Sequence, residues 1–323
     1  MKTDLNILLA NAEMRYQGGT QAWIHQMYRT LSGQHRVSVF TADGPVPQGL
    51  TGFVPSEPYD VALINHWPAS RALHKADIGL RIVTSHGVIP REEIPVLGAD
   101  RYVAVSESVQ ARIPFRSTVI RNPIDTNHFR SETGPSPRLR KIAFVSNRQG
   151  RALPLVQEAV GRLGLELRVV GKETAVKDPV EVYQWADLVI GIARVAMEAL
   201  ACGRNVLALD YMGFHGLIDR DNVQRLMHSN YGGHAHGEWP TVNVLMEEMR
   251  RYDARMDLRD HVQEYHHPSA VAGAYLDLAR SSAPSRIARV IRQGPKQLSS
   301  PKITQMLQAG SHLTSLVRRS ASQ

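Results

Sequence analysis

A single glutamate lies where it can do chemistry. Glu198 belongs to the stretch at positions 186–218, which reads ADLVIGIARVAMEALACGRNVLALDYMGFHGLI. Apolar residues recur there at helical spacing, so the stretch predicts a helix that carries this carboxylate among small apolar side chains. A carboxylate in such surroundings must be solvated, paired or bound to a ligand, because an unpaired buried charge is costly. The stretch is therefore the first candidate for a binding site.

The elements around this glutamate predict how it is positioned. A short apolar strand at 188–190 precedes the helix, Gly203 ends the helix as a left-handed cap would, and a second buried strand follows at 205–209. Gly213 and Gly216 then indicate a loop. Strand, helix and strand of these lengths predict a parallel crossover unit, and ligands bind beyond the carboxyl ends of such strands.

An arginine and a glycine follow the first two predicted strands of the second half of the chain. Arg148 comes just after a strand at 141–145, and its guanidinium carries a permanent charge and a fork of donors. Arg151 lies three residues further on, and Gly171 closes the next predicted strand, at 167–170. Arg148, at its strand tip, therefore suits a phosphate.

The first predicted strand, at 5–10, leads to a pair of glycines. Gly18 and Gly19 open an amphipathic helix, and glycines before a helix N-terminus let a phosphate approach the backbone N–H groups closely. His66 and His86 each follow a later short apolar strand. Strand after strand ending on a polar tip predicts a doubly wound parallel sheet.

Several of these segments resemble one family. The run AMEALACGRNVLALD…G…GLI is similar to the donor-site segment of family 4 glycosyltransferases, which are retaining enzymes of the GT-B fold. The opening ILL…GGTQAWIHQMYRTLSGQHRVSVFT and the motifs VTSHG, YVAVSESV and VIRNPIDTNHF resemble landmarks of the family's N-terminal domain. The similarity extends over about residues 5–217.

The resemblance implies roles on the donor side. Glu198 would accept hydrogen bonds from the ribose hydroxyls of the donor nucleotide, and Arg148 and Arg151 would form the basic pair that contacts the diphosphate. The loop after Gly171 would receive the nucleotide base. The family usually has a second glutamate eight positions earlier, and this chain has Ile190 there, which removes the usual sugar-contacting carboxylate.

The resemblance also implies roles for the N-terminal domain. Gly18 and Gly19 would lie near the donor diphosphate across an interdomain cleft, and His86 would be the catalytic residue that contacts the transferred sugar or the attacking acceptor. His66 has a similar placement and a weaker match.

The expected architecture is α/β of the GT-B type, with two Rossmann-like doubly wound domains facing a cleft and a basic C-terminal tail. The Pro- and Gly-rich linker SETGPSP, at 131–137, separates two similar halves. The expected parts are an acceptor-side domain at 1–134, a donor domain at 135–268, a crossover helix at 269–283 and the tail at 284–323.

Composition bounds the remaining possibilities. The formal net charge is +8, and seven of the 38 Lys and Arg residues but no Asp or Glu lie at 281–323, so the charge belongs mostly to the tail. Such a tail can be disordered or can lie on an anionic membrane surface.

The one cysteine, Cys202, excludes an internal disulfide and is expected in the core, and no apolar run reaches the ~20 residues of a membrane span. We expect a cytoplasmic protein, with the inner membrane surface as an alternative and no nucleic-acid partner.

Histidines at 228, 234 and 236 invite a metal interpretation, but no cysteine or carboxylate lies at a familiar ligand spacing, so we expect a loop with incidental histidines and no metal site. No cofactor is expected either, since the nucleotide-sugar is a substrate.

The leading hypothesis is a metal-independent, hexosyltransferase-like retaining glycosyltransferase. It would move a sugar from a nucleotide-sugar donor to a glycan, lipid-linked or small-molecule acceptor, in cell-surface glycan or polysaccharide biosynthesis. Two alternatives stay open: a catalytically degenerate GT-B binding or partner protein, motivated by Ile190, and a nucleotide-sugar epimerase of the same fold. A dinucleotide oxidoreductase is disfavoured, because no G-x-G-x-x-G follows the first strand.

Overall fold

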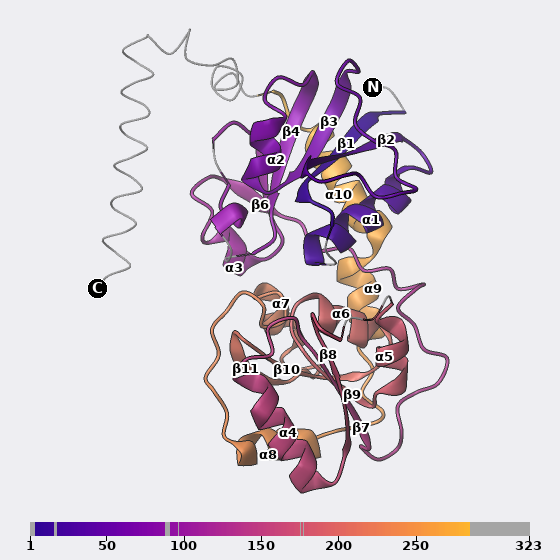
Figure 1. Cartoon of the computed structure of the whole chain (residues 1–323), viewed down its shortest axis with the longest axis vertical. Helices are drawn as coiled ribbons and strands as arrows, with labels where there is room; N and C mark the ends of the chain where they lie inside the picture. The colour runs from indigo at the N-terminus through magenta and orange to yellow at the C-terminus, as the bar shows by residue number, and fades with distance from the viewer. Residues whose placement is uncertain are drawn as a thin grey trace, which may run out of the picture. The chain divides into compact units, whose positions relative to one another are not determined.

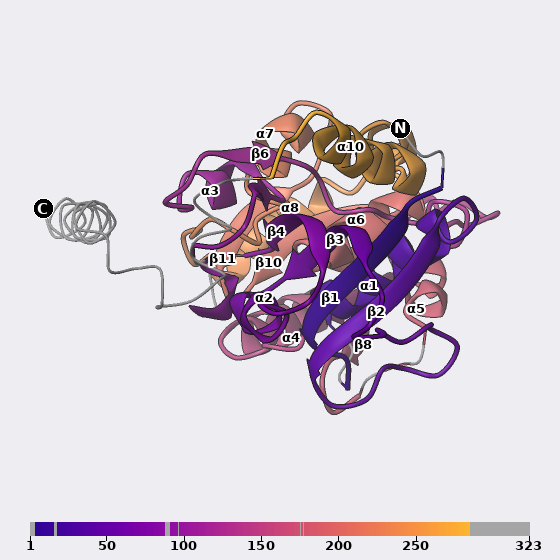
Figure 2. The same ribbon diagram turned by 90° about the horizontal axis from the view of Figure 1, so that it is seen from above.

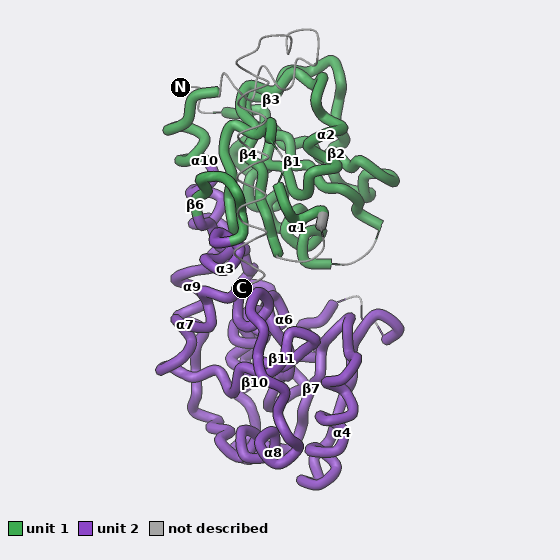
Figure 3. The backbone as a smooth tube through the Cα atoms, turned by 90° about the vertical axis from the view of Figure 1, so that its left-hand side faces the viewer, with its two compact units in different colours: residues 1–104, 112–118, 276–323 green, residues 105–111, 119–275 purple. Residues whose placement is uncertain are grey.

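The computed structural model describes residues 4–15, 18–87, 91–95, 97–174, 176 and 178–284. The chain forms two compact units (Figure 3). Unit 1 comprises residues 1–104, 112–118 and 276–323, and unit 2 comprises residues 105–111 and 119–275. The chain therefore passes between the units more than once, and the Pro- and Gly-rich linker at 131–137 lies inside unit 2. The predicted tail at 284–323 lies outside the described residues, apart from Pro284.

Unit 1 is a six-stranded sheet with helices. Its elements are β1 (Asn6–Glu13), α1 (Gly19–Leu31), β2 (Arg36–Asp43), β3 (Tyr59–Asn65), α2 (Trp67–Ala72), β4 (Ile78–Ser85), the short 3-10 helix η1 (Arg91–Glu93), β5 (Arg101–Ala104) and β6 (Ser117–Val119). The strand order is β2-β1-β3-β4-β5-β6, and the pairings from β2 to β5 are parallel (Figures 1 and 2).

The central strands of unit 1 are apolar on both faces. In β1, Leu8 and Ala10 belong to the apolar cluster that includes Ala69 of α2. Ile7 and Leu9 are also fully buried, and they face the other side of the sheet because side chains alternate along a strand. Helix α1 contacts β1 and β2. A sheet that is buried on both faces explains the nearly continuous apolar runs of the sequence.

Unit 2 contains a five-stranded sheet. Its elements are α3 (Glu107–Gln110), β7 (Lys141–Val145), α4 (Ala152–Leu163), β8 (Glu166–Val170), α5 (Val180–Trp185), β9 (Leu188–Ile190), α6 (Arg194–Ala201), β10 (Asn205–Asp210), β11 (Gly213–Leu217), α7 (Val223–His228), α8 (Val242–Arg250), α9 (Arg259–His266) and α10 (Pro268–Arg280), whose last residues belong to unit 1. The order is β11-β10-β9-β7-β8, with β11 antiparallel to β10 and the other pairs parallel.

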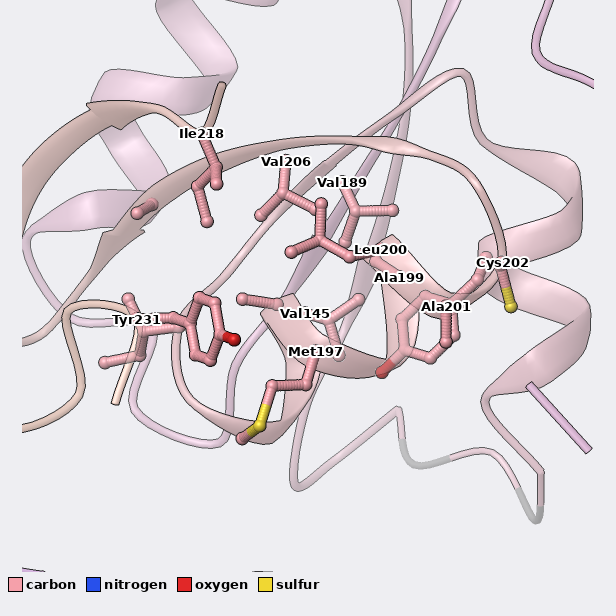
Figure 4. Close-up of a cluster of buried hydrophobic side chains, with 14 of the residues drawn as sticks. Val145, Val189, Met197, Ala199, Leu200, Ala201, Cys202, Val206, Ile218 and Tyr231 are labelled. Atoms are coloured by element: carbon pink, nitrogen blue, oxygen red, sulfur yellow. The ribbon is translucent and has the colours of Figure 1, made fainter. Parts of the chain in front are cut away.

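Alternation along the strands of unit 2 builds two apolar layers. Ile142 and Phe144 of β7 pack in a cluster with α4 and α8, whereas Ala143 and Val145 pack in a second cluster with α5, α6 and α9. Figure 4 shows part of the second cluster, in which Met197 of α6 lies beside Val145 of β7. The sheet is thus sandwiched between helices, as the predicted parallel crossover units require.

The two sheets share one topology. If strands are counted in chain order within each unit, the first five of unit 1 and the five of unit 2 both follow the order 2-1-3-4-5. The strand order therefore reverses between β1 and β3 in unit 1, and between β7 and β9 in unit 2. These are the topological switch points, where open α/β sheets bind ligands beyond the carboxyl ends of the strands.

Most predicted elements are confirmed, and one is wrong. Strands at 141–145 and 188–190 have the predicted bounds, and Gly203 has the left-handed φ of +68° expected of a helix cap. The loop predicted around the glycines at 213 and 216 is instead β11, an antiparallel strand whose register shifts beside Leu209. Helices α2, α7 and α9 were not predicted, because each is short and mixes polar and apolar residues without a long repeat.

Within the described part of the chain, no helix combines the length and apolarity needed to cross a membrane. Cys202 is buried, at 2% exposure, as its small apolar neighbours indicate.

Candidate functional site

In unit 1, polar side chains gather at the carboxyl ends of β3 and β4. Asn65 ends β3 and pairs in register with Thr84 of β4. His66 and His86 are the residues that follow the two strands. Because the strands are parallel neighbours, their tips and these two histidines lie at the same edge of the sheet.

A buried carboxylate joins the two strand tips. Glu93 of η1 is 7% exposed. Its Oε2 accepts the backbone N–H of His86 at 2.7 Å, and its Oε1 lies 3.3 Å from His66 Nε2. The Ser85 hydroxyl donates to the Glu93 carbonyl at 2.7 Å, which anchors η1 to the end of β4. Burial opposes the charged carboxylate, but the hydrogen bond from His66 and the nearby histidine charges outweigh it, so the pKa of Glu93 lies below its usual value.

The His86 ring is held by a different group. Its Nε2 lies 2.8 Å from Asn65 Oδ1, and its ring meets the edge of Trp23, with the centroids 5.6 Å apart. The structure therefore places His86 in a fixed orientation beside the unit 1 switch point. Its predicted contact with sugar or acceptor stays a prediction.

The tip of β3 is strained and carries unpartnered polar atoms. His66 has φ of +67°, which is uncommon outside glycine, and it precedes the first turn of α2. Within the described residues, three buried side-chain atoms in this region have no hydrogen-bond partner: Asn11 Oδ1, Asn65 Nδ2 and His66 Nδ1. Asn11 lies on β1 one residue beyond Ala10, which pairs with Ile64, so Asn11 and Asn65 are neighbours across the switch point.

The predicted glycine pair lies at the start of α1. Gly18 is the N-cap of this helix, is exposed, and has an extended backbone without a side-chain cap. Gly19 is the first helical residue and is also exposed. The nearby Gln21 amide donates to the Glu13 carbonyl at 3.0 Å, which ties the helix start to the end of β1.

In unit 2, Glu198 is buried in α6 and fully paired. Its Oε2 accepts the Tyr183 hydroxyl at 3.0 Å, and its Oε1 lies 2.9 Å from an Arg194 guanidinium nitrogen. Arg194 also donates to the Pro123 carbonyl at 3.1 Å. Burial raises the pKa of Glu198, although Arg194 and Tyr183 oppose this rise. Of the three environments that the sequence leaves open for Glu198, the structure shows a paired one.

The connection between β9 and α6 is short and carries no carboxylate. Ile190 is fully buried in the core, and only residues 191–193 join the strand to the helix. Gly191 is tightly enclosed, since an added Cβ would lie 2.4 Å from Val195 Cγ1. Ala193 caps the helix with φ of +53°.

The two predicted phosphate arginines are exposed and rest on aromatic rings. Arg148 follows β7, and its guanidinium carbon lies 4.7 Å from the centre of the Tyr211 ring. Arg151 caps α4 and lies 4.7 Å from the centre of the Trp239 ring. Stacking restricts both side chains while leaving their N–H groups available at the ring edges.

The remaining polar groups at this edge come from neighbouring strands. Gly171 follows β8, and a Cβ there would lie 2.4 Å from the Ser146 carbonyl oxygen, so only glycine fits. The Ser146 hydroxyl donates to Asp210 Oδ1 at 2.6 Å. Burial raises the pKa of Asp210, although the hydrogen bond from Ser146 lowers it. Residues 146, 148, 171 and 210 thus meet at the carboxyl edge of the sheet.

Sequence reasoning missed several of these partners. Arg194 lies four residues before Glu198, so the helical i,i+4 spacing was a usable signal. Tyr183 and Asn65 carry no local signal. Glu93 lies in an ordinary polar run, REE, and only the tertiary fold brings it to both histidines.

The predicted loop around His234 follows α7, and some of its side chains are buried and hydrogen-bonded. His234 is buried, and its Nδ1 lies 2.9 Å from the Ser106 hydroxyl. Tyr231 is also buried, and its hydroxyl lies 2.8 Å from Nε2 of both His261 and His266. No group of three or more His, Cys, Asp or Glu side chains in the described segments is arranged to hold a metal ion.

The chain resembles solved glycosyltransferase structures, although no protein-family profile and no curated protein matches it. AviGT4, a glycosyltransferase involved in avilamycin A biosynthesis, is 16% identical, with 85% of this chain and 97% of that chain covered and a TM-score of 0.57. The glycosyltransferase of kitacinnamycin is 12% identical, with 86% and 99% covered and a TM-score of 0.52. The catalytic domain of starch synthase IV from Arabidopsis thaliana, bound to ADP and acarbose, is 12% identical, with 86% and 99% covered and a TM-score of 0.53.

At these identities the likeness shows the fold. The chain has the GT-B fold, with two Rossmann-like units built on parallel sheets, which it shares with these glycosyltransferases.

Proposed function

We propose that this protein is a retaining glycosyltransferase, which moves a sugar from a nucleotide-sugar donor to a hydroxyl of a glycan, lipid-linked or small-molecule acceptor. The observation that carries the proposal is the carboxyl edge of the unit 2 sheet, where two exposed arginines follow a switch-point strand within a GT-B fold. Retention of anomeric configuration is what the similarity of the stretch at 186–218 to family 4 implies.

The donor diphosphate would bind at this arginine edge. Arg148 and Arg151 are permanently charged, and stacking on Tyr211 and Trp239 holds them in place before any ligand arrives. The starch synthase IV neighbour has ADP bound, so a nucleoside diphosphate is the ligand class that we propose for this edge.

The chemical demand on the protein is mainly electrostatic. The C1–O bond to the diphosphate breaks, and the nucleoside diphosphate leaves as a stable anion. Preorganised positive groups that neutralise the developing phosphate charge are usually the largest catalytic contribution. Arg148 and Arg151 would supply this stabilisation, and Glu198 would fix the ribose only if its pairing with Arg194 and Tyr183 leaves an oxygen lone pair for the sugar.

Calorimetric titration of UDP, GDP and ADP tests the proposal. We expect micromolar binding of one nucleotide to the wild type and roughly 10-fold or greater weakening in Arg148→Ala and Arg151→Ala, in line with charge-assisted phosphate contacts. Arg162→Ala is the matched control, because this exposed arginine at the other end of α4 pairs with Glu158. Absence of binding to all three nucleotides would contradict the proposal.

One observation favours a second candidate, a GT-B protein that binds a nucleotide without transferring sugar. The position of the usual first glutamate is the fully buried Ile190, so the site lacks that carboxylate. Nucleotide binding without release of sugar from any of the matching nucleotide-sugars would favour this candidate.

A further inference from the structure

We propose that Asp210 is a positioning residue, which holds Arg148 in place for the donor diphosphate through the Ser146 hydroxyl and the backbone of Tyr211. The inference rests on the proposed function, because it concerns the same arginine edge. It adds a residue that acts on the ligand only through its neighbours. All four residues belong to unit 2.

Asp210 binds both partners of the Arg148–Tyr211 stack through one oxygen. Its Oδ1 accepts the Ser146 hydroxyl at 2.6 Å and the Tyr211 backbone N–H at 2.7 Å. Ser146 Oγ in turn accepts the Arg148 backbone N–H at 2.9 Å. The guanidinium and the ring on which it rests are therefore both attached, at their backbones, to a single carboxylate.

The sheet explains how residues of two separated strands meet. In the order β10-β9-β7, the short strand β9 lies between the other two. Its last residue, Ile190, pairs with Phe144 on one side and Leu207 on the other. The chain continues past these two partners for two and three more residues, to Ser146 and Asp210. The two side chains therefore meet beyond the end of the central strand.

The Ser146 hydroxyl has no hydrogen left for a phosphate. A serine hydroxyl carries one hydrogen, and here Asp210 accepts it, while an oxygen lone pair accepts the Arg148 N–H. Hydrogen bonds to a carboxylate are among the strong ones. Ser146 is also buried, at 5% exposure. It therefore links the carboxylate to the arginine and does not itself bind the ligand.

Asp210 does not occupy the donors of the Arg148 guanidinium. Among the described residues, none accepts a hydrogen bond from this guanidinium, which lies on the Tyr211 ring. The carboxylate is 6% exposed. Burial raises its pKa, and its hydrogen bonds and the charge of Arg148 oppose this rise. The carboxylate thus orients the arginine and leaves its N–H groups available for phosphate oxygens.

Holding this arginine in place should improve affinity. Arg148 is exposed, and a mobile arginine side chain loses many rotamers when a ligand immobilises it. A ring beneath the guanidinium and an anchored backbone remove part of this loss before the ligand arrives, which is the general effect of preorganisation. The hydrogen bonds to Asp210 should therefore strengthen diphosphate binding without a contact between Asp210 and the ligand.

The test measures nucleotide affinity in the full chain by double-mutant cycles. The probes are UDP, GDP and ADP, and Ser146→Ala is compared in the wild-type, Arg148→Ala and Arg151→Ala backgrounds. Arg151 serves as the second background because its backbone position comes from α4. Ser131→Ala is the matched control, since this hydroxyl also has two hydrogen bonds but lies in the linker at 131–137.

We expect Ser146→Ala to weaken nucleotide binding roughly 3- to 10-fold, in line with the loss of a hydrogen bond. The loss should persist when Arg151 is already alanine and disappear when Arg148 is, because the hydroxyl acts only through Arg148. Ser131→Ala should bind the nucleotide as the wild type does. Equal losses in both arginine backgrounds would overturn the proposal, since Ser146 would then act independently of Arg148.

Substitutions of the carboxylate provide a second test. Asp210→Ala removes both hydrogen bonds and should weaken nucleotide binding more than Ser146→Ala does. Asp210→Asn keeps an oxygen that can accept them, so it should recover most of the lost affinity. No recovery in Asp210→Asn would contradict the positioning role. Urea unfolding shows whether each variant is folded, and if Asp210→Ala is not, the cycles with Ser146→Ala decide.

The outcomes separate this role from the transferase function. If one nucleotide binds and Arg148→Ala weakens it while Ser146→Ala does not, the positioning role of Asp210 fails alone. If no nucleotide binds to the wild type, the transferase function fails and the positioning role fails with it.

Discussion

The third strand of each sheet ends in the same unusual way. β3 of unit 1 is followed by His66 at φ of +67°, and β9 of unit 2 leads through a short turn to Ala193 at φ of +53°. Each of these residues caps the next helix, and each lies at the switch point of a sheet with the same strand order. Both sheets therefore have a residue with positive φ at the same place in their topology.

The side chains at the two positions differ. At the tip of β3 a ring meets a buried carboxylate and leaves one nitrogen without a partner among the described residues. After β9 the capping residue is an alanine, and the nearby carboxylate of Glu198 is closed off by Arg194 and Tyr183. The comparison teaches that the fold supplies the strained turn, while the residues placed on it decide whether polar atoms at the tip are paired or unpaired.

The largest expected effect is on the closed pair of unit 2. Glu198→Ala leaves the Arg194 guanidinium, which is 14% exposed, without its carboxylate, and breaking a buried ion pair costs about 3–5 kcal/mol. Urea unfolding measures this loss. Glu158→Ala, which breaks the exposed pair with Arg162 on α4, is the control and should cost less than about 1 kcal/mol. Equal effects of the two substitutions would show that the Glu198 pair is not structural.

Acid should destabilise unit 2 through its buried histidines. Burial lowers the pKa of His266 to about 3, and its Nδ1–H donates to the Asn122 carbonyl at 2.8 Å. The unfolded chain binds a proton at this histidine near the ordinary pKa of about 6.5. The stabilising contribution is therefore complete above about pH 6.5 and is lost toward about pH 3, at about 1.4 kcal/mol per pH unit.

The comparison of wild type and His266→Gln by urea unfolding at pH 7 and pH 5 isolates this contribution. The wild type should lose about 2 kcal/mol more than the variant between these pH values. Equal losses of unfolding free energy in the two proteins would refute this role of His266, because the carboxyl groups titrate alike in both.

Removing one hydrogen bond to Glu198 should have a smaller effect than removing the carboxylate itself. Tyr183→Phe deletes the hydroxyl that donates to Oε2 at 3.0 Å and keeps the buried ring, and a hydrogen bond to a charged group contributes about 1.5–3 kcal/mol. Thermal unfolding measures the loss, and Tyr28→Phe at an exposed hydroxyl is the control. A neutral result would mean that Arg194 alone satisfies the carboxylate.

The smallest expected effect concerns the strained alanine. Ala193→Gly relieves the positive φ and should stabilise the protein by up to about 1 kcal/mol. The same substitution inside α6, Ala199→Gly, should destabilise it by at least about 0.5–1 kcal/mol, because glycine is a poor helix former. Chemical unfolding of both variants measures the difference, and destabilisation by Ala193→Gly would show that the turn is not strained.

Local patterns predicted much of the fold. Apolar runs of the right length located β7 and β9 to the residue, and Gly203 marked the end of α6. The missed strand β11 follows β10 after a tight turn and contains two glycines, so its local composition indicates a loop and only the pairing with β10 makes it a strand.

The candidate site also combines residues that the sequence indicated with contacts that it did not. The sequence indicated Arg148, because it follows a short apolar strand at the edge where ligands bind, and the resemblance to family 4 indicated Arg151 and His86. It did not indicate that Glu93 contacts both His66 and His86. These histidines lie 27 and 7 residues before Glu93, and no periodic pattern links the three positions.

The sequence by itself thus determined two parallel-sheet units and the placement of polar residues at their strand ends, since short apolar runs and the polar residues that end them are local properties of the chain. Only the tertiary structure decided that Glu198 is paired and that His66 faces a carboxylate. Burial, strain and hydrogen-bond partners depend on which distant segments meet, and side chains of the same type become structural or reactive according to those neighbours.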